Sequence, residues 1–446
     1  MNIVKPNGLT KVKTQRRLLL KSALSASIVA GLAPAVIPNS TRAAQKELRI
    51  MRWKNFVPAF EDWFNNVFVK RWGEENDAEV VIDNVGLGDI NNLAEAEAMA
   101  QQGHDLVLFL APRAALEDHV IDHREVYEEC IHRYGATSDP VLRSCYNPRT
   151  GKYHGFCESY SPTLLTYRKD LWDAVGQTPD TWDAIRKGGR AIKLLHDNPV
   201  GISLASEHNC EHSMRAIMYS FSAAVQDING DPAINSGKTL DAIKFVKALF
   251  EEAMIPDVLS WGASSNNQFM LSGTGNLTLD TMSVIRSAES KELPVNKHLA
   301  LATLPEGPAG KIGPMFSANT YIIWRFAKSP ELAKKFLVDY IGAFQEGFLA
   351  SGFQNMPSFT GSVPNLAEAI ASDVRYRVLS DVPNTLSNLG SPGYSNAATD
   401  EVLRDGIVSK MFRSAATGAL APQEALDQAA KAVQPIFDKW REAGKI

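Results

Sequence analysis

Residues 47–53, Glu-Leu-Arg-Ile-Met-Arg-Trp, have the pattern of a short β-strand and begin the repeat that decides the fold. An amphipathic helical stretch follows at 59–73, then a strand at 78–83, a helix at 91–102 and a strand at 105–110. Strands alternating with helices are the signature of a parallel sheet covered by helices. Such sheets bind ligands at the carboxyl ends of their strands. The stretch therefore predicts an α/β fold with a ligand at that edge.

The rest of the chain continues to mix strands with helices. A Thr-Trp-Asp sequence at 181–183 opens a further helix, because a threonine before an apolar run is an N-cap signal. The Pro/Gly-rich stretch 305–314 is the best candidate for a domain boundary. The other elements that the periodicity predicts are strands at 161–168, 277–280, 298–304 and 320–326, and helices at 211–226, 239–253, 330–342 and within 396–446.

The first 44 residues have the layout of an export signal. Arg16 and Arg17 precede an apolar run at 22–38, and small residues suited to cleavage follow at 41–44. Paired arginines before such a run are typical of substrates of the twin-arginine export machinery. The alternative is a membrane anchor that stays attached, but the run is short and broken by glycine and proline. We expect a mature protein that begins near Gln45 and works in the periplasm.

Charge excludes several classes of partner. The chain has 46 Lys and Arg against 50 Asp and Glu, a net charge of −4. Residues 1–44 contain seven of the positive groups and no acidic residue, so the remainder carries 39 positive and 50 negative groups. A net charge of −11 leaves no basic face for nucleic acid or an anionic membrane surface. We therefore expect neither as a partner.

Four cysteines follow the leader, at positions 130, 145, 157 and 210. In an oxidising compartment they allow three full pairings, and the sequence does not choose between them. Cys130 and Cys145 are the easiest pair to close because they are near in sequence. The alternative is that all four are buried free thiols, since a domain of this size does not need disulfides.

Several short motifs occur in a fixed order along the chain. The clearest are Lys-Tyr-His-Gly-Phe at 152–156, Leu-Leu-Thr-Tyr-Arg-Lys-Asp-Leu-Trp at 164–172 and Pro-Asp-Thr-Trp-Asp at 179–183. Weaker matches lie at 269–273, 304–308, 333–337 and 417–426. Together they resemble the extracellular solute-binding proteins of ABC importers, in the group that includes the maltose-binding protein. Phe156-Cys157-Glu158 and Arg168 depart from the pattern usual in that group.

The resemblance implies a periplasmic-binding-protein fold of two α/β lobes, each a mostly parallel sheet flanked by helices, with the ligand in the cleft between them. The N-terminal lobe would comprise 45–158 plus 305–347, and the C-terminal lobe 159–304 plus 348–446. The chain would cross between lobes near 158–161, 302–306 and 346–358. Ligand binding would close the hinge and present the closed form to ABC permease subunits of the inner membrane. Such a protein is a monomeric binder without a cofactor, not an enzyme.

Sugar recognition needs flat aromatic faces together with carboxylates or amides for the hydroxyl groups. Side chains of these kinds occur at predicted strand ends and loops, where they would line the cleft. The candidate ligand-binding residues are Trp53, Asn55, Phe56, Phe109, Glu158, Tyr160, Trp261, Asn267, Asp280, Thr281, Asn319, Gln354, Asn355 and Tyr394. Few basic residues lie among them, so the set fits a neutral polyhydroxylated ligand such as a sugar better than an anion.

Three alternatives stay open. Glu158 and Asp280 also suit a cationic ligand such as a polyamine. The pairs His119/His123 and His208/His212 are spaced i and i+4, which would place each on one face of a helix as a candidate metal site. Solvent-exposed helix faces have the same spacing, and we expect no metal. A periplasmic carbohydrate-active enzyme needs only two acidic residues at a suitable separation. However, the sequence has neither a Gly-x-Ser-x-Gly nor a phosphate-binding loop motif.

Overall fold

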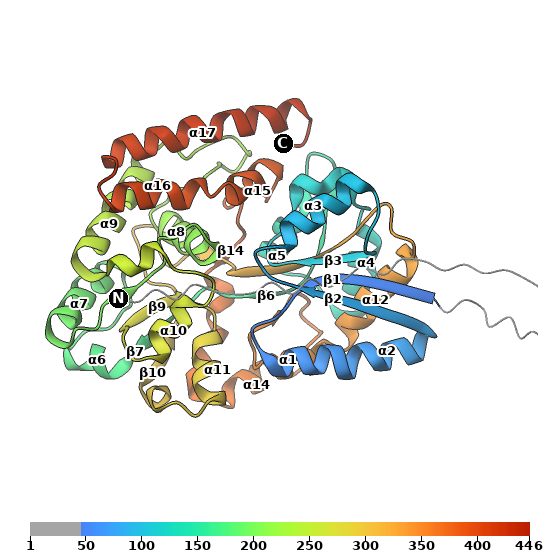
Figure 1. Cartoon of the computed structure of the whole chain (residues 1–446), viewed down its shortest axis with the longest axis horizontal. Helices are drawn as coiled ribbons and strands as arrows, with labels where there is room; N and C mark the ends of the chain where they lie inside the picture. The colour runs from blue at the N-terminus through green and yellow to red at the C-terminus, as the bar shows by residue number, and fades with distance from the viewer. Residues whose placement is uncertain (1–45) are drawn as a thin grey trace, which may run out of the picture. The chain divides into compact units, whose positions relative to one another are not determined.

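A computed structural model of the chain describes residues 46–446, and the expected leader lies outside the described residues. The described part contains two larger sheets with helices packed around them (Figure 1). Among residues 46–446, no helix is long and apolar enough to cross a membrane.

The first sheet has six strands. Its parallel part consists of β1, β2 and β3, the strands of the strand–helix repeat described in the sequence. Strands β1 and β2 run parallel over eight residue pairs, and β3 is parallel to β1 on the other side. β12 then pairs antiparallel with both β3 and β6, and β13 is antiparallel to β6. The order across the sheet is β13 (Met356–Pro357), β6 (Phe156–Ser161), β12 (Ser317–Ile323), β3 (Leu106–Phe109), β1 (Lys46–Trp53) and β2 (Ala78–Val85).

The helix predicted at 59–73 is longer and less regular than the sequence indicated. It has a π-helical turn, η1, between two α-helical segments, and the larger aromatic rings of this stretch face the core. The helical elements associated with the first sheet are α1 (Pro58–Asp62), η1 (Trp63–Phe68), α2 (Val69–Asn76), α3 (Ile90–Ala100), η2 (Ala114–His119), α4 (Arg124–Tyr134), α5 (Asp139–Cys145), α12 (Pro330–Gly342) and α13 (Phe344–Ala350). The short strands β4 (Tyr146–Asn147) and β5 (Lys152–Tyr153) form a separate hairpin.

The second sheet has four strands and is mainly antiparallel. Strand β7 is antiparallel to β10 and β9, and only β8 and β9 are parallel. Its order is β10 (Leu299–Ala302), β7 (Leu164–Arg168), β9 (Leu277–Asp280) and β8 (Val200–Gly201). The expected mostly parallel sheet is therefore found only in part, since β7 runs antiparallel to both of its neighbours.

Helices make up most of the remaining structure around the second sheet. They include α6 (Lys169–Ala174), α7 (Trp182–His196), α8 (His208–Ser220), α9 (Gly237–Ala253), η3 (Pro256–Leu259), α10 (Ser265–Leu271), α11 (Ser283–Ser290) and η4 (Pro294–His298). The C-terminal part adds α14 (Leu366–Ala371), η5 (Val374–Ser380), η6 (Val382–Asn384), α15 (Ala397–Arg404), α16 (Ile407–Ala416) and α17 (Pro422–Glu442). Strands β11 (Gly313–Pro314) and β14 (Leu386–Ser387) form a further parallel pair.

The single strand predicted at 161–168 is two strands that belong to different sheets. β6 ends at Ser161 in the first sheet, and β7 begins at Leu164 in the second. Pro162 lies between them, and proline cannot donate a ladder hydrogen bond. The helix predicted at 330–342 is confirmed over the same residues, whereas the strand predicted at 320–326 begins earlier, at Ser317.

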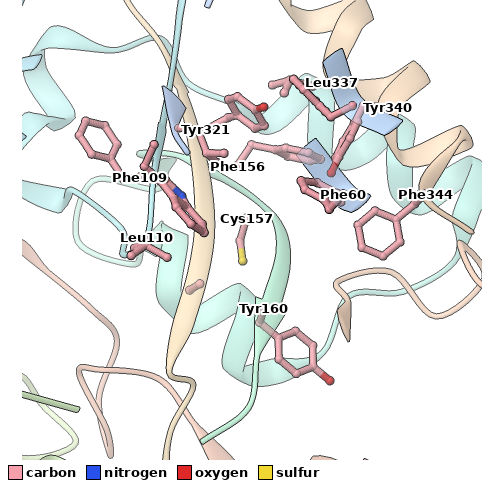
Figure 2. Packing of buried hydrophobic residues seen from close by; sticks show 14 of the residues in the cluster. Phe60, Phe109, Leu110, Phe156, Cys157, Tyr160, Tyr321, Leu337, Tyr340 and Phe344 are labelled. Carbon is pink, nitrogen blue, oxygen red and sulfur yellow. The ribbon is translucent and has the colours of Figure 1, made fainter. Parts of the chain in front are cut away.

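Buried apolar side chains form two clusters. One centres on the six-stranded sheet, where Phe60, Tyr321 and Tyr340 bring together aromatic rings from α1, β12 and α12 (Figure 2). It continues into α11 and η5, which lie beyond that sheet. The other cluster joins the second sheet to α7, α8, α9 and α15–α17. The polypeptide around the two sheets is thus packed in close contact.

All four cysteines are buried and free. None of the three pairings that the sequence allows is formed, including the one between Cys130 and Cys145. Burial raises the pKa of the Cys130 thiol to about 12, which keeps it protonated and unreactive. The alternative of buried thiols packed as small apolar side chains describes this structure.

Candidate functional site

Two adjoining cavities lie between the carboxyl edge of the first sheet and the helices of the second. They share Leu87, Leu110, Glu207, His208 and Ala263 in their walls. We call the first the aromatic cavity. It is lined by Trp53, Phe56, Leu87, Leu110, Ser161, Glu207, His208, Asn209, Ala263, Ser264, Asn267, Asp280, Thr281, Ser283, Phe316, Ser317 and Gln354. Its free volume of about 50 Å³ holds only a few water molecules.

The wall of the aromatic cavity on the first-sheet side is formed where parallel strands end. Trp53 is the last residue of β1, Leu87 follows β2, and Leu110 follows β3. This is the edge at which open α/β sheets bind ligands, as the strand pattern predicted. The Trp53 side chain is buried, yet its indole Nε1 has no hydrogen-bond partner. It therefore offers an unused donor at the cavity wall.

The opposite wall is formed by the ends of elements around the second sheet. Asp280 ends β9, and its Oδ2 accepts a hydrogen bond of 2.6 Å from the Ser283 hydroxyl at the start of α11. Glu207 precedes α8, and its carboxylate accepts hydrogen bonds from the backbone N–H groups of Asn209 and Cys210. Burial raises the pKa of both carboxyls, although these neutral donors oppose the shift.

His208 is neutral at pH 7, because burial lowers its pKa to about 4. Its Nε2 lies 2.8 Å from the carbonyl oxygen of Phe316, to which it donates a hydrogen bond. His212 stacks on it with ring centroids 3.9 Å apart and bonds through Nδ1 to the His208 carbonyl. The two rings of this i, i+4 pair therefore pack against each other, and each forms a hydrogen bond to a backbone carbonyl.

The other histidine pair is not a shared site either. His123 uses both ring nitrogens within the core: Nδ1 lies 3.0 Å from the Tyr153 carbonyl, and Nε2 accepts a hydrogen bond from the Ile323 N–H. His119 lies near Gln101 instead. Within residues 46–446, no group of three or more His, Cys, Asp or Glu side chains is arranged to hold a metal ion.

We call the second, larger space the charged cavity, which has a volume of about 500 Å³. It is lined by Leu87, Gly88, Ile90, Asn91, Phe109, Leu110, Ala111, Arg113, Ser206, Glu207, His208, Glu211, Ala263, Asp400, Leu403, Arg404, Asp405, Gly406, Ser409 and Lys410. Its walls come from α3, the loop after β3, and the segments around α8, α15 and α16.

A network of ion pairs crosses the charged cavity and joins the two sides. Arg113, from the loop after β3, lies 2.8 Å from Glu95 of α3 and 3.4 Å from Asp400 of α15. Arg404 of α15 contacts the same two carboxylates at 2.8 and 3.5 Å. Asp400 Oδ2 also accepts the backbone N–H of Ala115 at 3.0 Å. We call Glu95, Arg113, Asp400 and Arg404 the cross-cleft network.

The structure brings half of the fourteen candidate residues to the cavities. Six line the aromatic cavity: Trp53, Phe56, Asn267, Asp280, Thr281 and Gln354. Phe109 lines the charged cavity. The seven that line neither are Asn55, Glu158, Tyr160, Trp261, Asn319, Asn355 and Tyr394.

Several of these seven have protein partners instead. Asn55 holds its own loop, since its backbone N–H donates to Glu61 and its Oδ1 accepts from the Val57 N–H. Asn319 donates to the Ser159 hydroxyl, and Trp261 packs on the ring of Phe269. Three buried residues have a side-chain atom without a partner: Oε2 of Glu158, Oδ1 of Asn319 and Nδ2 of Asn355. Tyr160 is a buried residue of the central strand β6, and Tyr394 packs against Tyr146 and Arg143.

Glu207, which precedes α8, and the cross-cleft network were not among the candidate residues. Glu207 could have been found, because an acidic residue just before a helix is a common N-cap. The network could not, because its members come from segments far apart in the chain and none belongs to a local motif.

Comparisons with known proteins place this geometry in a family. Residues 58–342 match the model for bacterial extracellular solute-binding proteins. No curated protein matches the chain in sequence. Several solved structures share the fold, each at less than one-fifth sequence identity.

One is a sugar transporter from Arthrobacter chlorophenolicus A6 with bound laminaribiose, at 15% identity and a TM-score of 0.74 over 87% of this chain and 99% of that one. Another is maltose-bound MalE3 of T. maritima, at 17% identity and a TM-score of 0.71 over 87% of this chain and 99% of that one. A third is a putative oligosaccharide periplasmic-binding protein from Synechococcus sp. MITs9220 in complex with zinc, at 15% identity and a TM-score of 0.74 over 88% and 99% of the two chains.

These likenesses confirm the two-lobed α/β fold. The family match covers more than half of the chain and confirms the resemblance that the motifs at 152–183 indicated. The family consists of binding proteins that act outside the cytoplasm. The chain therefore belongs to the bacterial extracellular solute-binding proteins.

Proposed function

We propose that this protein captures a sugar or sugar-like solute in the periplasm and delivers it to the permease subunits of an ABC importer. The aromatic cavity carries the proposal, because it combines flat rings with partly unused polar groups. Trp53 Nε1 is a buried donor and Gln354 Oε1 a buried acceptor, and neither has a partner. Leaving such groups unpaired is unfavourable, and a ligand hydroxyl can satisfy either of them.

The ligand would be bound between the two lobes. The free volume of the aromatic cavity is smaller than a sugar ring, so the proposal requires the lobes to separate to admit one. Closure over the ligand is then a population shift driven by contacts to both walls. The proposed contacts are Trp53, Phe56, Phe109, Asn267, Asp280, Thr281 and Gln354, joined by Glu207, Asn209 and Phe316.

The remaining features of the proposal come from the sequence. The leader at 1–44 would be recognised by the twin-arginine export machinery, and the mature protein would act as a monomer. The lobes would comprise 45–158 plus 305–347 and 159–304 plus 348–446. Two relatives of the same fold, whose structures hold laminaribiose and maltose, support a carbohydrate ligand.

A thermal-shift screen of the mature protein against sugars and polyols tests this function. A ligand present at about a hundred times its Kd stabilises the folded state by about 2.7 kcal/mol, which is a shift of several degrees. We expect one sugar class to give such a shift and to be recovered chemically unchanged. If no sugar shifts the transition, or if the sugar is consumed, the proposed function is wrong.

Removing the Trp53 ring should weaken sugar binding strongly. Trp53→Ala deletes both the flat face and the unpaired Nε1 donor of the cavity wall. We expect a Kd at least ten times higher, which corresponds to about 1.4 kcal/mol, in a calorimetric titration. Trp440→Ala is the matched control because Trp440 lies on α17, where its Nε1 bonds to Glu401. An equal loss of affinity in both variants would contradict a specific role for Trp53.

The cross-cleft network should favour the closed form. Asp400→Asn keeps an acceptor for the Ala115 N–H but removes the charge that faces Arg113 and Arg404. We expect a Kd raised about tenfold, equivalent to about 1.4 kcal/mol, because closure loses an ionic contact between lobes. Asp241→Asn, which changes an exposed carboxylate on α9 away from both cavities, should leave the Kd unchanged. Small-angle scattering should show a more open Asp400→Asn protein without ligand, and an unaltered profile would count against this role.

A further inference from the structure

The aromatic cavity contains two carboxylates and no cationic side chain. Of its seventeen lining residues, only Glu207, His208 and Asp280 can ionise near neutral pH. His208 is neutral there, because burial lowers its pKa to about 4. The Asp280 carboxylate also repels charge on Glu207 and raises the pKa of Glu207 further. Two acidic side chains therefore share the cavity wall without a counter-ion among its own residues, and a bound cation would favour their ionised forms.

The arginines nearby are already paired with other carboxylates, and Lys410 of the charged cavity donates to the Asp405 carbonyl. Arg113 and Arg404 face Glu95 and Asp400 in the cross-cleft network. Arg215, on the buried side of α8, is paired with Glu211. Because these arginines are already paired with carboxylates, they do not act as counter-ions for Asp280 and Glu207.

The hydrogen bonds inside the cavity point to a ligand rich in donors. Asp280 and Glu207 accept only from neutral groups, namely a serine hydroxyl and backbone N–H groups. The Gln354 side chain is 4% exposed, and its Oε1 has no partner. Among the fully buried wall atoms without a partner, the donor Trp53 Nε1 accompanies this acceptor, and the two carboxylates retain further lone pairs. An ammonium group has three donors and no acceptor, whereas a hydroxyl has one donor.

We propose that the solute carries a protonated amine beside its hydroxyl groups, as an amino sugar does, and that Asp280 and Glu207 bind this amine. The inference rests on the proposed function and narrows its substrate class. A charge-assisted hydrogen bond to a carboxylate is stronger than one between neutral groups. The Trp53 ring adds a face on which a cation is attracted by the aromatic quadrupole.

Calorimetric titration of matched ligands tests this substrate class. The pairs are glucosamine with glucose and galactosamine with galactose, together with N-acetylglucosamine, in which acetylation removes the charge. We expect each amine to bind at least ten times more tightly than its neutral counterpart. The advantage should shrink as salt is raised from 20 to 500 mM, because screening weakens the ionic contact. Spermidine is included to distinguish an amino sugar from a simple polyamine.

Two isosteric variants locate the effect. Asp280→Asn and Glu207→Gln keep the side-chain shape but remove one charge each, and we expect either to reduce the preference for the amine about tenfold. Affinity for the neutral parent sugar should fall by a smaller factor than affinity for the amine, and an unchanged far-ultraviolet circular dichroism spectrum shows that each variant is folded. Asp241→Asn, an exposed carboxylate on α9, is the control for net charge and should preserve the preference.

The outcomes separate this inference from the proposed function. Neutral sugars that bind as tightly as their amines would overturn the inference and leave the sugar-binding function intact. Spermidine binding without any sugar or amino sugar would overturn both the amino-sugar class and the proposed function. A preference for amines that survives in both Asp280→Asn and Glu207→Gln would overturn the assignment to these two carboxylates.

Discussion

Glu61→Gln should destabilise the folded protein by about 3–5 kcal/mol, because it leaves Arg52 buried without its counter-ion. Arg52 lies on β1 and is only 1% exposed. Its Nη1 donates to Glu61 Oε2 at 2.9 Å, and its guanidinium stacks over the Phe64 ring at 4.3 Å. The cation therefore has no access to water once the carboxylate charge is gone, and its desolvation is uncompensated.

The same carboxylate also shapes the site. Glu61 Oε1 accepts the backbone N–H of Asn55 at 2.7 Å, which holds the loop that carries Phe56 into the aromatic cavity. Glutamine retains an acceptor at this position, so most of the loss should be electrostatic. We expect equilibrium unfolding in urea to show a lower midpoint for Glu61→Gln, with weaker ligand binding as a secondary effect.

A double variant checks the physical cause. Replacing both partners, as Arg52→Met with Glu61→Leu, removes the buried charge altogether and should recover most of the stability lost in Glu61→Gln. Asp173→Asn breaks an exposed pair with Lys169, whose side chains are 60% and 59% exposed, and should leave the unfolding midpoint unchanged. A double variant less stable than Glu61→Gln would show that packing, not the unpaired charge, causes the loss.

The sequence predicted the α/β fold because the fold depends on local pattern, and the same pattern named residues that the structure places around the aromatic cavity. Trp53 ends a strand whose position in the alternation is clear, and Phe56 follows it. Asp280 ends a short apolar strand. The carboxyl ends of parallel strands meet at one edge, so residues there could be expected to face a ligand. The structure places all three in the wall of the aromatic cavity.

The direction of side chains on β6 could not be predicted in this way. Every residue from Phe156 to Ser161 is buried, so this central strand has no polar face that would reveal its alternation. Ser161 reaches the aromatic cavity, whereas Glu158 faces the core near Tyr340 and Arg52. Glu158 was a ligand candidate because it lies at a predicted crossing between the lobes, and only the structure shows its actual surroundings.

Contacts between the two sides of the cleft could not be predicted from the sequence either, for a different reason. Arg113 and Asp400 come from elements that pack around different sheets, and their approach depends on how the lobes close. Likewise, the position of Glu207 at the cavity depends on the packing of α8 rather than on a local motif. Periodicity describes single elements and carries no information on how two lobes meet.

Glu158→Gln should stabilise the protein at high pH and have little effect at low pH. Glu158 is a residue of β6. Its side chain is buried in the core, and its Oε2 has no hydrogen-bond partner. Burial raises its pKa from 4.5 to about 8, although hydrogen bonds with Ser159 and Tyr340 and the charge of Arg52 oppose the shift. At neutral pH the carboxyl is therefore mostly protonated in the folded protein and ionised in the unfolded chain.

The sign of the pH dependence follows from proton binding. Between pH 4.5 and 8 the folded state holds a proton that the unfolded state has released, so the free energy of unfolding falls as pH rises. Above pH 8 the full shift corresponds to a loss on the order of 5 kcal/mol. Glutamine has no proton to release, so the difference in stability between Glu158→Gln and the wild type should grow from pH 5 to pH 9.

Urea unfolding of both proteins at pH 5, 7 and 9 measures this difference. Glu74→Gln, on the exposed face of α2, serves as the control and should show no pH-dependent gain. A Glu158→Gln variant with the same advantage at every pH would mean that Glu158 does not change its protonation on folding. A gain confined to high pH would instead identify the carboxyl as a buried neutral acid. Its role would then lie in the core of the first lobe, since an acid that is protonated and enclosed at neutral pH cannot present a charge to a ligand in the cleft.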